Sequence, residues 1–255
     1  MYGTLRVAVV IPAHNEASLL PVTLAGIPNW IDHIIVVDDQ STDATVEQFK
    51  RATNPGLELI RHGINQGVGA AICSGYARAR SLGVDATVVM GADNQMDPNE
   101  IHRLLDPIVE DRADYVKGNR MGHPELFKRM PWIRLGGNVC LTRLTRFATG
   151  YGELNDAQCG YTAINGRTLD RVDLGTLFPR YGFPNDLLAK LANLNARVED
   201  QPVSPIYENE SSELRIHRVA LPILGILVRA TLQRGRRWRR SRQALVLENG
   251  APEVS

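Results

Sequence analysis

The chain has 255 residues, of which 44% are hydrophobic and 22% charged, and this composition excludes a disordered or collagen-like protein. Its three cysteines form no CxxC pair, which argues against a disulfide framework or a zinc cage and favours a reducing cytosol. The net charge of +1 is unevenly distributed, because residues 214–242 contain nine arginines and no acidic residue. We therefore expect an acidic body joined to a basic tail.

Short apolar runs alternate with helical patterns through the first 120 residues. The predicted strands are residues 6–12, 34–38, 57–61, 86–91 and 114–118, and the predicted helices are residues 17–27, 43–51, 67–82 and 99–110. Because the chain runs straight into the first strand, we expect no signal peptide. Further along we expect a helix, a turn with a strand, a second helix and a last strand, at residues 131–149, 155–165, 185–195 and 197–203. This order predicts an α/β fold, with a mostly parallel sheet, helices on both faces and ligands at the carboxyl ends of the strands.

Two adjacent carboxylates, Asp38 and Asp39, end the second predicted strand. Successive side chains of a strand face opposite ways, so we expect one of them to accept hydrogen bonds from a base or a ribose. The other interpretation is an Asx-turn followed by a helix cap. Both stay open, because Ser41 or Asp43 can cap the next helix while Asp39 binds a ligand.

Two further loops carry ligand chemistry. The segment from Asn65 to Gly69 precedes a helix, so its glycines allow close backbone approach and the helix offers N–H groups to an anion. After the fourth strand, Asp93 and Gln95 stand two residues apart on an extended loop. Hard oxygen ligands of this kind fit Mg²⁺ or Mn²⁺ bridging a diphosphate, although Asp93 read without its context is equally a turn residue.

Several motifs occur in one order along residues 5–215. They are VVIPAHNEASLL, VVDDQSTDAT, NQGVGAA, GADNQMDP, KGNRM, CGYTAI and YGFPNDLL. Together they resemble glycosyltransferase family 2 with its GT-A fold, and within it the dolichol- and polyprenyl-phosphate sugar synthase branch. The resemblance implies inverting, metal-dependent transfer of a sugar from a nucleoside diphosphate sugar, with a UDP-sugar favoured.

The resemblance also implies site residues. Those for the nucleotide-sugar would be Pro12, Ala13, Glu16, Asp38, Asp39, Asn65, Gly67, Ala92 and Asp93. Asp93 and Gln95 would hold the metal, with Gly91 standing where the family has its first aspartate. Arg120 and Arg134 match arginines for an acceptor phosphate, whereas the SGFR turn of the family has become CGYT, without its arginine.

The acceptor has two interpretations. A phosphate is already anionic and needs positive charge, which Arg120 and Arg134 would supply. A hydroxyl needs a general base, for which Asp186 matches the family's catalytic position. We favour a polyprenyl phosphate at the cytoplasmic membrane face. The alternative is a hydroxyl of a small-molecule or natural-product intermediate, such as a nucleoside antibiotic. Asp186 could also simply stabilise a helix N-terminus.

The basic tail sets the expected domain organisation. We expect a catalytic domain at residues 1–213 and a basic amphipathic tail with a disordered end at residues 214–255. The apolar run Val219–Val228 is too short to cross a bilayer. With the arginines and Trp238 it fits an anionic membrane surface, so we expect a peripheral protein and no nucleic-acid partner, despite the arginine run. Gly91 also motivates a different hypothesis, a domain that binds nucleotide-sugar without turning it over.

Overall fold

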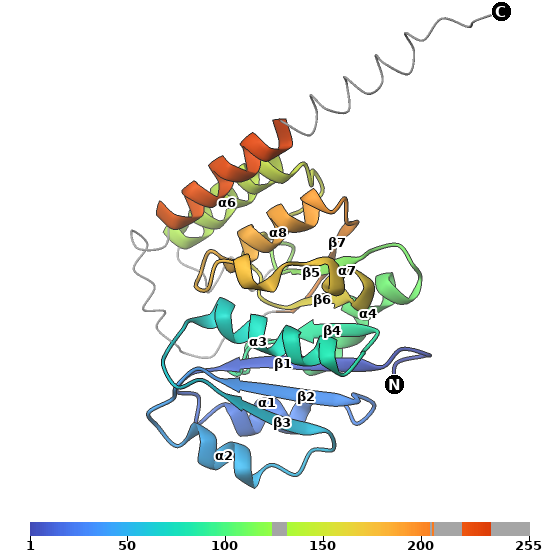
Figure 1. Ribbon diagram of the computed structural model, residues 1–255, viewed down its shortest axis with the longest axis vertical. Coiled ribbons are helices and arrows are strands. Elements are labelled where there is room, and N and C mark those ends of the chain that lie inside the picture. Colours follow the sequence, from blue (N-terminus) through green and yellow to red (C-terminus); the bar gives the residue numbers. More distant parts are fainter. Residues whose placement is uncertain (124–131, 205, 207–220, 236–255) are drawn as a thin grey trace, which may run out of the picture.

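The computed structural model describes residues 1–123, 132–204, 206 and 221–235, and for residues 133 and 134 it describes only the backbone (Figure 1). Within these residues the chain forms a seven-stranded sheet with the order β3-β2-β1-β4-β6-β5-β7. In chain order the strands are β1 (Val7–Ala13), β2 (His33–Asp38), β3 (Leu57–Arg61), β4 (Ala86–Val89), β5 (Tyr115–Asn119), β6 (Thr162–Asn165) and β7 (Val198–Pro202). Only β6 runs antiparallel to its neighbours, β4 and β5. The predicted α/β fold with a mostly parallel sheet is therefore confirmed.

Helices cover both faces of the sheet. The α-helices are α1 (Leu20–Gly26), α2 (Thr45–Arg51), α3 (Val68–Ser81), α4 (Ile101–Val109), α6 (Trp132–Thr149), α7 (Gly166–Arg171) and α8 (Phe183–Asn193). Short 3₁₀ turns occupy Pro98–Glu100 and Leu174–Thr176. Of the helices, α7 was not predicted, because six residues are too few to show a helical period.

The two faces arise from alternation along the strands. In β1, Val7, Val9 and Ile11 pack with α1 and α4 in one buried cluster. Ala8 and Val10, which point the other way, pack with α3 and α8 in a second cluster. Because both faces are buried there, the central strands β1, β2 and β4 are apolar almost throughout, as expected for a parallel sheet between two layers of helices.

One glycine allows α3 to approach the sheet closely. A Cβ atom at Gly75 would lie 2.2 Å from Cγ1 of Val10 on β1. Glycine at this position therefore sets the distance between α3 and the sheet, and with it the position of the helix N-terminus at the carboxyl edge.

A further helix spans residues 221–235 and lies beside α6 (Figure 1, red). Its buried residues Ile223, Leu227 and Ala230 pack against Ala148 of α6 and Ala189 of α8. Among the described residues, no helix has the length and apolar character needed to span a membrane. The predicted division at residue 213 stays a prediction, although this part of the predicted tail packs on the helices before it.

Candidate active site

Three loops meet at the carboxyl edge of the sheet, and Asp39, in the loop after β2, contacts the other two. Its Oδ1 accepts hydrogen bonds from the backbone N–H of Gln66 at 2.8 Å and from the ring of His62 at 2.8 Å. Its Oδ2 accepts one from the backbone N–H of Gly67 at 2.7 Å. The backbone oxygen of Asp39 also lies 2.8 Å from Nδ1 of His14 in the loop after β1. Asp39 therefore fixes the loop that leads into α3.

These contacts determine the charge on Asp39. Burial by itself would raise the pKa of this carboxyl group, but the hydrogen bonds from Gln66, His62 and Gly67 together hold the pKa below its ordinary value. A carboxylate held by backbone N–H groups and a histidine remains anionic at neutral pH. It therefore presents a fixed negative charge at the point where β2 ends.

Asp38, whose side chain points to the opposite face of β2, is also held by hydrogen bonds within the chain. Its Oδ1 accepts from the N–H of Ser41 at 3.0 Å, and its Oδ2 accepts from Nε of Arg61 at 3.1 Å. Asp38 and Asp39 are both buried, and both oxygens of each carboxylate accept hydrogen bonds from the chain itself. Acceptance of a further hydrogen bond from a base or a ribose by one of them stays a prediction. The Asx-turn contact belongs to Asp43, whose Oδ1 accepts from the N–H of Thr45 two residues on at 3.0 Å, whereas Asp38 reaches the N–H three residues on.

The loop after β1 is held by the loop after β2. The N–H of Asn15 donates to Oγ of Ser41 at 2.9 Å, and the N–H of Glu16 donates to Oγ1 of Thr45 at 2.8 Å. The predicted residues Pro12 and Ala13 lie at the end of β1, and Asn65 donates from Nδ2 to the backbone oxygen of Asp39 at 3.3 Å. These predicted nucleotide-site residues are therefore brought together at one edge. Their contact with a nucleotide stays a prediction.

His62 is a residue that the sequence analysis missed. Its ring lies between Oδ1 of Asp39 and Oγ of Ser74 on α3, with Nε2 2.9 Å from that hydroxyl. It thus couples the end of β2 to the helix that follows the next strand. A lone histidine after a predicted strand carries no spacing pattern, so the sequence offered no signal for it.

The N-terminus of α3 is partly occupied by the chain itself. Gly67 adopts a positive φ of 100° and its N–H is bound to Asp39. The N–H of Ala70 donates to the backbone oxygen of Pro179 at 2.9 Å. Of the N–H groups predicted for an anion, these two already have partners, and Phe178–Arg180 lies against the helix start.

The predicted metal residues lie after β4. Oδ1 of Asp93 accepts from the N–H of Gln95 at 3.2 Å. A Cβ atom at Gly91 would lie 2.7 Å from that same Oδ1, so the carboxylate of Asp93 fills the space next to the glycine. Ala92 is buried, and its backbone oxygen accepts from Thr23 at 3.1 Å. No cluster of three or more His, Cys, Asp or Glu side chains able to hold a metal occurs among the described residues.

Arg120 lies just beyond β5 and forms a two-point ion pair. Its Nε donates to Oδ2 of Asp156 at 2.7 Å and its Nη2 to Oδ1 at 3.1 Å. Burial would raise the pKa of Asp156, but the guanidinium beside it lowers the pKa below its ordinary range. Burial lowers the pKa of neighbouring Lys117, whose Nζ donates to the backbone oxygen of Cys159. The positive charge of Arg120, which was predicted to bind an acceptor phosphate, is therefore partly neutralised by Asp156 within the chain.

Asp186 lies in the first turn of α8 with its side chain only 2% exposed. Its Oδ2 accepts from the N–H of Phe178 at 2.9 Å, and its Oδ1 is paired with Arg229 of helix 221–235. The carboxylate therefore fastens two segments, and Arg229 is a partner that the sequence analysis missed. Arg134 lies on α6, and its side chain is outside what the structure describes.

The sheet order and the loops gathered at its carboxyl edge define a GT-A-type domain. The structure of glucosyl-3-phosphoglycerate synthase from Mycobacterium tuberculosis, solved with Mn²⁺, UDP and phosphoglyceric acid, has a similar fold. The TM-score is 0.70 at 17% identity, over 89% of this chain and 79% of that one.

Residues 8–169 match glycosyl transferase family 2, and the chain belongs to this family. A UDP-N-acetylglucosamine–dolichyl-phosphate N-acetylglucosaminyltransferase of Methanococcus voltae is 31% identical, over 79% of this chain and 86% of that protein. A polyprenol monophosphomannose synthase of Mycolicibacterium smegmatis is 30% identical, over 79% of this chain and 77% of that protein. The predicted resemblance to this branch is confirmed, and the protein is a glycosyltransferase.

Proposed function

We propose that this enzyme transfers a sugar from a nucleoside diphosphate sugar to a polyprenyl-phosphate-type acceptor, with inversion at the anomeric carbon. The observation that carries the proposal is the engagement of Asp186, whose two carboxylate oxygens are both bonded within the chain. A hydroxyl acceptor needs a base with room to accept a proton, whereas a phosphate acceptor arrives already ionised. The two relatives named for dolichyl phosphate and for a polyprenol product are in agreement.

The donor would bind where the loops after β1, β2 and β3 meet. Asp39 is anionic and lies beside Asn65 and Gly67, which favours recognition of the N–H edge of a base or the hydroxyls of a ribose. We favour a UDP-sugar because the Methanococcus voltae relative is named for UDP-N-acetylglucosamine. Pro12, Ala13 and Glu16 would form the adjoining wall of the nucleoside site.

The residues after β4 fit a metal that arrives with the diphosphate. Mg²⁺ is commonly held by one or two carboxylates together with substrate phosphates, so Asp93 and Gln95 provide enough protein ligands for Mg²⁺ or Mn²⁺. A metal bound there would neutralise the charge of the leaving diphosphate. Because Gly91 stands where the family has an aspartate, the chain offers one protein ligand fewer to the metal. The hypothesis of a domain that only binds nucleotide-sugar predicts that this loss abolishes turnover.

The acceptor would meet the arginines of the second half of the sheet. Arg120 lies at the end of β5, and Arg134 lies on α6. Because Asp156 engages both Nε and Nη2 of Arg120, an acceptor phosphate would compete with this ion pair for the guanidinium. Such an acceptor would place the enzyme at the cytoplasmic face of a membrane as a peripheral protein.

The decisive experiment compares two acceptors with the same chain. Purified enzyme is incubated with labelled UDP-sugars and Mn²⁺, and with either a polyprenyl phosphate or the matching polyprenol. We expect label in the lipid only with the phosphate, lost in Asp93→Ala. Transfer to the polyprenol or to a small hydroxyl acceptor, abolished in Asp186→Asn, would instead establish the alternative. Donor binding without turnover of any acceptor would support the binding-only hypothesis.

A further inference from the structure

Helix 221–235 is apolar on two opposite sides. Its inner side carries Ile223, Ile226, Leu227 and Ala230, all of them buried. Its outer side carries large hydrophobic residues three or four positions apart, and all are more than half exposed: Leu221, Leu224, Val228 and Leu232. An amphipathic helix at the surface of a protein in water normally has a polar outer side. The exposed apolar stripe on the outer side of this helix is therefore not explained by packing within the described residues.

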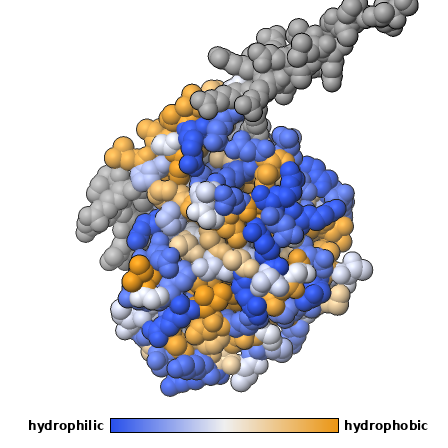
Figure 2. All heavy atoms as spheres, viewed as in Figure 1, coloured by the Kyte–Doolittle hydropathy of each residue, from blue (hydrophilic) through white to orange (hydrophobic). Residues whose placement is uncertain are grey.

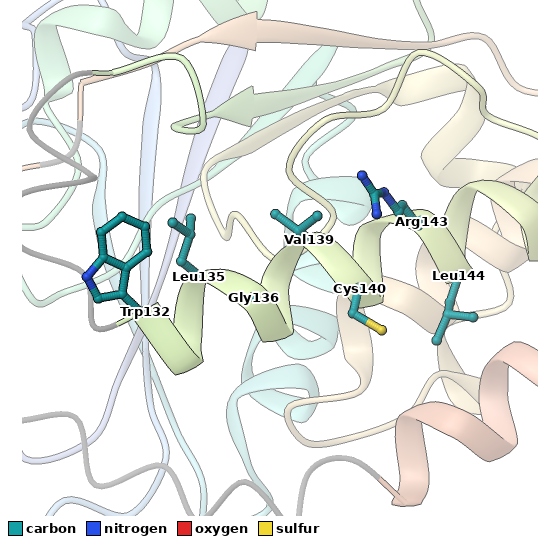
Figure 3. A pocket seen from close by; sticks show the side chains of 7 residues that line it. All are labelled: Trp132, Leu135, Gly136, Val139, Cys140, Arg143 and Leu144. Atoms are coloured by element: carbon teal, nitrogen blue, oxygen red, sulfur yellow. The ribbon is translucent and has the colours of Figure 1, made fainter.

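Helix α6 has a similar outer side. Trp132, Val139, Leu144 and Phe147 are exposed along it, and Trp132 and Phe147 are 77% and 67% exposed. A shallow groove of about 420 Å³ runs along this helix, lined by Trp132, Leu135, Gly136, Val139, Cys140, Arg143 and Leu144 (Figure 3). Most of these lining side chains are apolar, and Arg143 adds an exposed positive charge.

The two helices are neighbours, and their exposed apolar residues lie at the same end of the molecule (Figure 1). Leu141 of α6 packs against the cluster that contains Ile223 and Leu227, and Arg234 donates to the backbone oxygen of Phe147 at the end of α6. In Figure 2, hydrophobic residues gather at the end of the molecule where these helices lie. We name this surface the two-helix face and define it by Trp132, Val139, Leu144 and Phe147 of α6 together with Leu221, Leu224, Val228 and Leu232.

We propose that the two-helix face docks on an anionic lipid bilayer, with both helices lying in the interface. The prediction from the sequence combined the apolar run Val219–Val228 with the arginines and Trp238 of the tail, whereas here α6 contributes half of the residues that define the apolar face. The charge of the sequence that adjoins helix 221–235 selects the occupant. Five arginines follow helix 221–235 directly, at positions 236, 237, 239, 240 and 242, and residues 214–242 contain no Asp or Glu.

A bilayer satisfies both features of the face, since acyl chains cover the apolar residues and anionic headgroups meet the arginines. A second copy of the chain would cover the apolar residues but would bring two sets of arginines together, and like charges at an interface are unfavourable. The inference rests on the proposed function only for its purpose, which is to bring the enzyme to a lipid acceptor. Vesicle binding is measured without donor or sugar transfer, so the two can fail separately.

The test uses a pair of valines of equal exposure. Val228 on the two-helix face is 51% exposed, and Val22 on α1 is 52% exposed. The full-length protein, Val228→Asp, Phe147→Asp and the control Val22→Asp are sedimented with vesicles of phosphatidylcholine, with and without phosphatidylglycerol. Melting temperatures verify that each variant is folded.

We expect the wild type and Val22→Asp to bind vesicles containing phosphatidylglycerol equally, and Val228→Asp and Phe147→Asp each to bind at least tenfold more weakly. Binding to pure phosphatidylcholine should be weaker for every protein. Equal binding by all four proteins would overturn the proposal. A loss in Val228→Asp but not in Phe147→Asp would exclude α6 from the surface. A wild-type dimer that Val228→Asp dissociates, seen by light scattering without vesicle binding, would assign the face to a second copy.

Discussion

Replacing Asp39 by Asn removes the charge at the centre of the loop cluster while keeping the shape of the side chain. The carboxylate accepts three hydrogen bonds, from His62, Gln66 and Gly67, and lies in a buried position. Asn offers a single oxygen, so its NH₂ group must face at least one backbone N–H, which then loses its partner. A buried donor left unsatisfied costs about 1–3 kcal/mol, and hydrogen bonds to a charged group contribute about 1.5–3 kcal/mol. We therefore expect Asp39→Asn to lower the free energy of unfolding by about 3 kcal/mol.

This loss should be visible in thermal unfolding. For a chain of this length 1 kcal/mol corresponds to about 2–4 °C, so we expect the melting temperature to fall by about 6–12 °C. The matched control is Asp170→Asn, because Asp170 is 66% exposed and its ion pair with Arg80 is 3.5 Å long. Surface changes of that kind stay within about 0.5 kcal/mol. The UDP-induced rise in melting temperature should also shrink in Asp39→Asn and not in the control.

The effect of Asp39→Asn should depend on pH in a defined direction. The pKa of Asp39 is lower in the folded protein than its ordinary value of 3.8, so its contribution is complete above that pH. It is lost as the pH falls through the lower, folded-state pKa. The stability gap between wild type and Asp39→Asn should therefore be constant from pH 7 to pH 5 and narrow below about pH 4. A gap under about 1 kcal/mol that does not change with pH would refute the role assigned to the carboxylate.

Three further changes test other parts of the structure. Gly75→Ala should lose about 1–3 kcal/mol by overpacking against Val10, whereas Gly136→Ala, where no atom lies within 4 Å of the new Cβ, should be neutral or stabilising in the same melting assay. Gly91→Asp should move the carboxylate of Asp93 and strengthen the UDP-dependent shift in melting temperature caused by Mn²⁺; an unchanged shift would show that position 91 does not face the metal. Arg120→Ala should destabilise the protein, because the buried Asp156 loses its ion partner, and Asp156→Asn added to it should restore part of the loss measured by urea unfolding.

Strands β1, β2 and β4 were predictable from the sequence because each is a short apolar run with polar residues at its carboxyl end. Asp38 and Asp39 were correctly placed at that edge, but their engagement was not predictable. Whether a carboxylate binds a ligand or its own backbone depends on the path of the loop around it, and that path is set by residues distant in sequence such as His62 and Gly67. The ion pair of Arg229 with Asp186 could not be predicted for the same reason, because the two residues are distant in sequence. Arg229 belongs to the basic tail that was predicted to lie on an anionic membrane surface, yet its side chain forms an ion pair with Asp186 of α8.

The pair formed by Asp186 and Arg229 connects the acceptor question with the two-helix face. Asp186 is almost wholly buried while Arg229 is 53% exposed, so solvent screens the pair and its contribution is smaller than that of a fully buried ion pair. A double-mutant cycle with Asp186→Asn and Arg229→Ala measures that coupling. If Asp186 holds helix 221–235 in place, both single variants should weaken vesicle binding and the double variant should lose no more than either one. If Asp186 is instead a general base, Asp186→Asn should abolish transfer to a hydroxyl acceptor while vesicle binding stays at the wild-type level. The same two variants therefore separate a positioning role from a catalytic one, and the phosphate acceptor requires the first outcome.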